Sequence, residues 1–192
     1  MGRSSPRRRR SVEGPAPASA TPNVGVGLAP TPSLSAATAP RVWQGVGYRP
    51  LPEPAVARPL FDFAALPWPA HHAFGWGAFV AGPSAAERLV GALMAEADQR
   101  AMFFHGPVVR EGDDPMEIAA QLVAAAIDHA VALGGETLFT RPQGLDRVWV
   151  RFGFIPLPES TLPESLAGRP GAGLYAWRGG SALWMLREGP RE

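Results

Sequence analysis

The chain of 192 residues contains no cysteine and no lysine. Without cysteine it has no disulfide, no thiolate metal site and no cysteine nucleophile, and the redox compartment stays open. Its 18 basic residues are all arginine, which genomic base composition explains as easily as function does. The adjacent His71 and His72 cannot both face one ion from a regular strand or helix, and no carboxylate is suitably spaced beside them. The sequence therefore predicts no metal site.

Long apolar runs are also missing. A membrane-spanning helix needs about 20 consecutive apolar residues, and the longest nearly apolar stretch, "IAAQLVAAAIDHAVALGG", is interrupted by Gln121, Asp128 and His129. This stretch is typical of a buried amphipathic helix, with His129 in the core. We therefore predict no membrane span, and we expect a cytoplasmic protein.

Charge and composition divide the chain into two parts. Residues 1–58 hold eight arginines and two acids, a net charge of +6, whereas residues 59–192 hold ten arginines and fifteen acids, a net charge of −5. These values add up to the overall +1. A basic N-terminal part thus precedes an acidic domain.

Residues 1–40 are rich in Ala, Pro and Ser and nearly free of aromatic residues, so they cannot bury enough apolar surface to offset the entropy of ordering. We predict a disordered arm. The cluster Arg7–Arg10 has three alternative uses: contact with a polyanion such as nucleic acid or an anionic membrane, part of a targeting peptide, or a solubilising tail.

Residues 41–75 scatter aromatic side chains among prolines, and we predict an extended segment that packs on the domain. The domain itself, residues 76–188, shows alternating strand and helix patterns. Strands are expected over 75–82, 101–109, 136–141 and 154–158, helices over 85–100, 115–133 and 144–153, and a hairpin over 171–187. For the first helix, Ser84 and Glu87 fit a capping box. For the second, Asp113 or Asp114 is the N-cap and Gly134-Gly135 the end.

This order predicts an α/β fold: a mixed, largely parallel sheet with helices on both faces and a C-terminal antiparallel hairpin. The segments "AAAIDHAVALGGETLF" and "LDRVWVRFGF" lie within it. Their sequence and order resemble the GNAT superfamily of acyl-CoA-dependent N-acyltransferases, with Arg151, Gly153 and Phe154 at the places of the family's R-x-G-F. The resemblance covers 50 to 60 residues well and extends to the rest by topology.

The resemblance implies acetyl-CoA or another acyl-CoA as co-substrate and no metal. It implies that the strand 101–109 splays away from the strand 136–141, and that the pantetheine arm pairs with the backbone of Val108 and Val109. The diphosphate would lie on the loop from Arg110 to Pro115, where the N-terminus of a helix favours an anion.

The chain departs from the family in that loop. The family's "[RQ]-x-x-G-x-[GA]" is here "REGDDP", so that Asp113 and Pro115 stand at the glycine places and Gly112 comes one place early. Carboxylates beside a diphosphate repel it by about 1 kcal/mol per close pair in water. A well-capped helix start that binds no ligand is the alternative interpretation of these residues.

The catalytic residues also depart from the pattern. Trp149 stands at the cofactor-contacting place where the family often has a tyrosine that protonates the thiolate, and an indole is no general acid at neutral pH. Tyr175 is the candidate to replace it, with a core aromatic as the alternative. His105, within the strand expected to splay, is the candidate general base, and a hydrogen-bonded core histidine is its alternative.

Two functions follow from this pattern. The first is an acyltransferase, in particular an N-acetyltransferase, that moves an acyl group from acyl-CoA to the amine of a small molecule or peptide. The second is a non-catalytic module of the same fold with a degenerate CoA loop. The acceptor would contact the irregular segments 41–75 and 156–173, which carry no decodable motif.

Overall fold

The computed structural model describes residues 32–82, 86–167 and 184–187. All of them belong to one unit, residues 31–192. The strands are β1 (Arg41–Trp43), β2 (Val46–Pro50), β3 (Phe74–Ala81), β4 (Glu87–Asp98), β5 (Ala101–Val109), β6 (Thr137–Thr140), β7 (Ile155–Pro156) and β8 (Trp184–Arg187). The α-helices are α1 (Leu34–Ala37), α2 (Arg58–Phe63), α3 (Pro115–Ala132), α4 (Asp146–Arg151) and α5 (Glu164–Ala167), and the 3₁₀ turns are η1 (Pro54–Ala57) and η2 (Glu159–Thr161).

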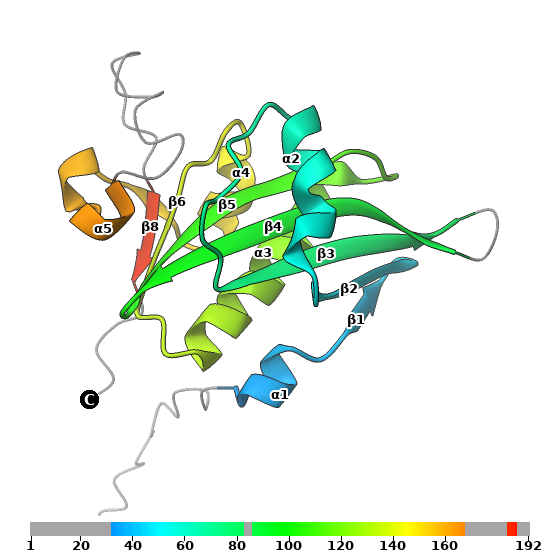
Figure 1. Ribbon diagram of the computed structural model, residues 1–192, viewed down its shortest axis with the longest axis horizontal. Coiled ribbons are helices and arrows are strands. Elements are labelled where there is room, and N and C mark those ends of the chain that lie inside the picture. Colours follow the sequence, from blue (N-terminus) through cyan, green and yellow to red (C-terminus); the bar gives the residue numbers. More distant parts are fainter. Residues whose placement is uncertain (1–31, 83–85, 168–183, 188–192) are drawn as a thin grey trace, which may run out of the picture. The chain divides into compact units, whose positions relative to one another are not determined.

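The strands form one mixed sheet in the order β1-β2-β3-β4-β5-β6-β8-β7 (Figure 1). The β5–β6 pair is parallel, and the other strand pairs of the described residues are antiparallel. The expectation of a largely parallel sheet is therefore wrong. The antiparallel pairs arise because β3, β4 and β5 follow one another through short connections, which reverse the chain direction.

Helices cover both faces of the sheet, as predicted. On one face α3 packs on β3, β4 and β5 and forms the larger core around Trp76, Leu93, Phe104 and Leu122. On the other face α2 packs on β4 and β5 over Ala92, Met94 and Val108. Figure 1 shows α2 and α3 on opposite sides of these strands.

The prediction of a helix over residues 85–100 is wrong, because residues 87–98 form strand β4. Leu89, Leu93 and Ala97 fit one helical face, but β4 lies between β3 and β5 in a sheet that is covered on both sides. Both faces of such a strand are apolar, so its sequence loses the alternation that distinguishes a strand from a buried helix. Ser84 of the expected capping box lies outside the described residues.

Helix α3 is confirmed, and so are both of its ends. Asp114 is the N-cap, since its side chain accepts a hydrogen bond from the Glu117 N–H at 3.0 Å, and Pro115 occupies the first turn. After Leu133 the chain reaches Gly134, whose φ of 86° suits glycine.

The N-terminal segments contain more regular structure than the sequence indicated. Residues 41–75, expected as an extended segment, contain β1, β2, η1 and α2, and α1 falls within the expected arm. Of the expected terminal hairpin, residues 184–187 are described and form β8, antiparallel to β6. Among the described residues, no helix is long and apolar enough to span a membrane.

His129 ties α3 to the sheet. Its ring is buried and stacks on Phe74, and its Nδ1 accepts a hydrogen bond from the Trp76 Nε1–H at 3.1 Å. Burial lowers the pKa of His129 below its ordinary value of 6.5. Since the neutral ring accepts the indole proton, protonation of His129 would remove this contact.

The buried histidine makes stability depend on pH. As the pH falls below 6.5, His129 takes up a proton in the unfolded chain before it does so in the folded one, so stability is lost as the pH falls through the folded pKa. We expect the H129Q variant, whose amide oxygen still accepts from Trp76, to be less stable by about 1 kcal/mol at pH 8 but to lose less stability between pH 7 and 5. Urea unfolding at several pH values measures this slope, and H72Q, which changes an exposed histidine, is the matched control.

Candidate functional site

The site begins where strands β5 and β6 separate. They pair in parallel from Ala101 and Thr137 to Phe104 and Thr140, and the Thr140 hydroxyl donates to the Phe104 carbonyl at 3.2 Å at the last pair. Beyond this point β5 continues to Val109, whereas β6 ends at Thr140. Among the described residues, no strand pairs with this edge of β5 after Phe104, which is where the family resemblance implied a splay.

A cavity of about 250 Å³ lies in this opening, and we call it the splay cavity. Its walls come from the end of β5, the first turns of α3, the segment after α2 and the loop before α4. The lining residues are Ala64, Leu66, Pro107, Val108, Val109, Pro115, Met116, Ala119, Gln143 and Leu145. The structure thus brings the predicted Val108 and Val109 together with the N-terminus of α3.

The loop from Arg110 to Pro115 joins β5 to α3. The Arg110 N–H donates to the Val90 carbonyl at 2.8 Å, and its guanidinium lies 5.6 Å from the ring centroid of Phe63, on the side of the sheet that α2 covers. Gly112 has a φ of 149°, and a Cβ there would lie 2.3 Å from Cδ1 of Ile118. The φ value favours glycine at position 112, and any side chain there would displace the end of the Ile118 side chain.

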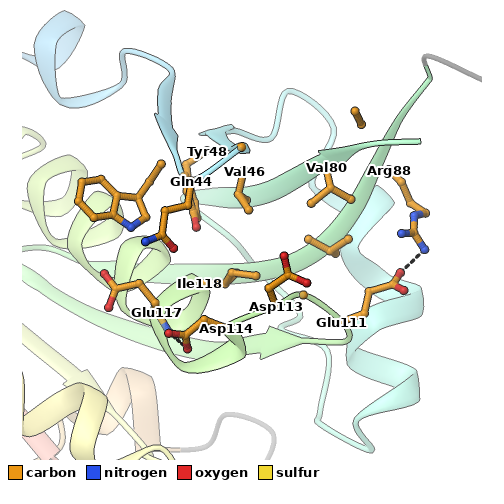
Figure 2. Close-up of a pocket in the computed structure, with 15 residues that line it drawn as sticks. Gln44, Val46, Tyr48, Val80, Arg88, Glu111, Asp113, Asp114, Glu117 and Ile118 are labelled. Atoms are coloured by element: carbon orange, nitrogen blue, oxygen red, sulfur yellow. Dashed lines mark hydrogen bonds and ion pairs between the residues drawn. The ribbon is translucent and has the colours of Figure 1, made fainter. Parts of the chain in front are cut away.

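Asp113 and Asp114 do not line the splay cavity. Together with Glu111 and Glu117 they line a second cavity, of about 560 Å³, which we call the acidic cavity. Figure 2 shows these carboxylates on one side of it, opposite side chains from the N-terminal strands. Within the described residues, the splay cavity has no Asp or Glu in its lining. The carboxylates expected to repel a diphosphate therefore lie on the other side of the α3 N-terminus, away from the splay cavity.

His105 lies on β5 just beyond the last pair with β6, and its ring is 8% exposed. Its Nε2 lies 3.2 Å from Oε2 of Glu96, which is itself 1% exposed. The other oxygen of Glu96 accepts from the His71 N–H at 3.3 Å. A carboxylate at this position orients the imidazole and favours the tautomer with hydrogen on Nε2, which leaves Nδ1 as the basic atom.

His105 lines a recess of about 20 Å³, together with Phe61, Gly106 and Arg141. Leu66 and Gln143 line both this recess and the splay cavity, so the two spaces adjoin. The recess has room for about one water molecule.

Two charged residues of this region were missed by the sequence analysis. Glu96 fell within the expected helix, where a lone acid gave no reason to place it beside His105. Arg141 follows β6, is 5% exposed, and donates to both carboxylate oxygens of Glu159 at 2.9 and 2.7 Å. An acid inside the apolar run "ALMAEA" was the available signal for a buried partner.

Trp149 lies away from both cavities. Trp149 is fully buried in the core that α3 covers, where it packs on Phe104 and Phe154, and its Nε1 has no hydrogen-bond partner among the described residues. Tyr175 lies outside the described residues, so its role stays a prediction.

This architecture has similar examples among solved structures. No family model matches the chain, and no curated protein matches it. Among solved structures it is similar to N-acetylglutamate synthase from Neisseria gonorrhoeae, complexed with coenzyme A and N-acetyl-glutamate, at 18% identity and a TM-score of 0.53 over 78% of this chain. The same enzyme complexed with coenzyme A and L-arginine gives 16% identity and 0.53 over 76%. This chain spans 36% of the length of the first of these synthase chains.

A GNAT-family acetyltransferase from Staphylococcus aureus Mu50 is also similar, at 13% identity and a TM-score of 0.44, over 59% of this chain and 66% of that one. At these identities the likeness to the synthase, with its TM-score of 0.53, concerns the fold alone. The chain has a GNAT-like fold.

Proposed function

We propose that this protein transfers an acyl group, in particular acetyl, from acyl-CoA to an amine. The observation that carries this proposal is the end of β5–β6 pairing at Phe104 and Thr140, with a cavity beyond it that reaches the N-terminus of α3. Among the described strands none pairs with β5 beyond Phe104, so its backbone groups there can pair with an extended ligand. An extended amide chain such as pantetheine is a ligand of this kind.

In this proposal the pantetheine arm lies along Val108 and Val109 and the diphosphate lies at the start of α3. The Asp114 side chain already holds the Glu117 N–H, and the Ile118 N–H bonds the Asp114 carbonyl. Pro115 has no N–H to offer, so Met116 supplies the first-turn donor. The Arg110 guanidinium adds positive charge beside the cavity mouth formed by the segment after α2.

The chemistry requires the loss of one proton from the acceptor amine. In the proposed step the amine nitrogen attacks the thioester carbonyl, and the new C–N bond forms as the C–S bond breaks. Nδ1 of His105 takes the amine proton, directly or through the water-sized recess. The CoA thiolate leaves and takes a proton from solvent, to which the imidazole returns the amine proton. Glu96 acts as a positioning residue, since it holds the imidazole through Nε2.

Ligand binding tests the first half of the proposal. Acetyl-CoA and free CoA should each raise the melting temperature of the full chain with saturation, by on the order of 5 °C at 100 times the dissociation constant. The M116W variant should abolish the shift, because Met116 lines the splay cavity and is 41% exposed, so that a larger ring fills the entrance.

The matched control is V150W, which places the same ring on an exposed position of α4 and should bind like the wild type. If neither CoA nor acetyl-CoA shifts the melting temperature at millimolar concentration, the proposal is wrong.

Catalysis tests the second half. Because the chain has no cysteine, a thiol reagent detects released CoA without a protein background, and amino acids, amines and peptides can be screened as acceptors. With an acceptor found, H105A should lower kcat by about 100-fold and E96Q by about 10-fold, with an altered pH profile for E96Q. Saturable CoA binding with unchanged kcat in H105A would exclude His105 as the base.

A further inference from the structure

The acidic cavity shares no lining residue with the splay cavity, and the two lie on different sides of the α3 N-terminus. One side of the acidic cavity is the segment from Glu111 to Ile118. The other comes from the β1–β2 turn with Gln44, from β2 with Tyr48, and from β3 and β4 with Arg88 (Figure 2). Its volume of about 560 Å³ is in the range of small-molecule sites. The acyl-transfer proposal leaves this cavity without a role.

Charge in the acidic cavity is unbalanced. Of its four carboxylates, Glu111 pairs with Arg88, and Glu117 pairs with Arg151 at 2.8 Å. Asp113 and Asp114 have no ion pair with any described residue. Within the described part of the chain, this wall therefore carries two carboxylates without a cationic side chain beside them.

Tyr48, on strand β2, lines the acidic cavity as well. Its side chain is 2% exposed and lines the cavity, and its hydroxyl has no hydrogen-bond partner among the described residues. Burial, and then the charge of Glu117, raise the pKa of Tyr48 to about 12, so the hydroxyl stays protonated at neutral pH. The Tyr48 hydroxyl therefore offers a ligand in the cavity a hydrogen-bonding partner.

The remaining walls favour an organic cation. Trp43, Val46 and Ile118 give the cavity an aromatic and apolar surface, on which methylene groups and a cationic head can pack. Among the residues that the structure describes, no group of three His, Asp or Glu side chains is arranged to hold a metal ion.

We propose that the acidic cavity binds an aliphatic dication, a small molecule with two ammonium or guanidinium groups, at a site separate from acyl transfer. One cationic group lies against Asp113 and Asp114. The other donates to the Tyr48 hydroxyl and the Gln44 side chain near Glu117, and the aliphatic chain packs between them on Val46 and Ile118.

Calorimetric titration of the full chain at low salt tests this site, with agmatine and 1,4-diaminobutane as probes and butylamine as the single-charge control. The dications should bind saturably, and butylamine about tenfold more weakly. Y48F, which removes one oxygen, and D113N, which removes one charge on an exposed loop, should each raise the dissociation constant by about three- to tenfold.

Two matched variants distinguish binding in the acidic cavity from general charge attraction and from binding in the splay cavity. E53Q removes one charge from an exposed position outside the cavity and should leave dication binding unchanged, and so should M116W, which fills the splay cavity. The proposal is overturned if butylamine binds as well as agmatine, or if E53Q weakens binding as much as D113N does. It is also overturned if M116W abolishes binding, which would make the dication an acceptor in the splay cavity, or if calcium competes with agmatine at equal concentration.

Discussion

The structure depends on one constraint on the backbone of β5. This strand keeps its antiparallel partner β4 over most of its length but loses β6 after Phe104. A sheet that closed this gap would leave no space between β5 and the start of α3. The splay cavity, the position of His105 at its edge and the approach to the first turn of α3 all result from this one separation.

Elements on both faces of the sheet surround the splay cavity. On one face the long α3 is held against the sheet by an apolar core and, in its last turn, by the hydrogen bond between Trp76 and His129. On the other face α2 and the segment after it cover β4 and β5 and supply Leu66 to both the cavity and the His105 recess. The end of β5 and the start of α3 thus line a space that a ligand can fill.

The α3 N-terminus separates two environments of different charge. Pro115, Met116 and Ala119 face the splay cavity, whereas Asp113, Asp114 and Glu117 face the acidic cavity. The loop sequence "REGDDP" therefore has two roles. Its acids cap the helix and form a negative surface on the acidic cavity. Among the described residues, the lining of the splay cavity contains no carboxylate.

The sequence by itself determined the helix α3, with a cap at Asp113 or Asp114 and a glycine end, and the strand β5, because capping and periodicity are local properties. That Asp114 is the cap was decided by the tertiary structure. The tertiary structure alone decided that residues 87–98 form a strand, since a central strand covered on both faces has the same apolar content as a buried helix. It alone placed Glu96 beside His105 and turned Asp113 and Asp114 away from the splay cavity, because side chains far apart in the chain meet only through sheet register and helix packing.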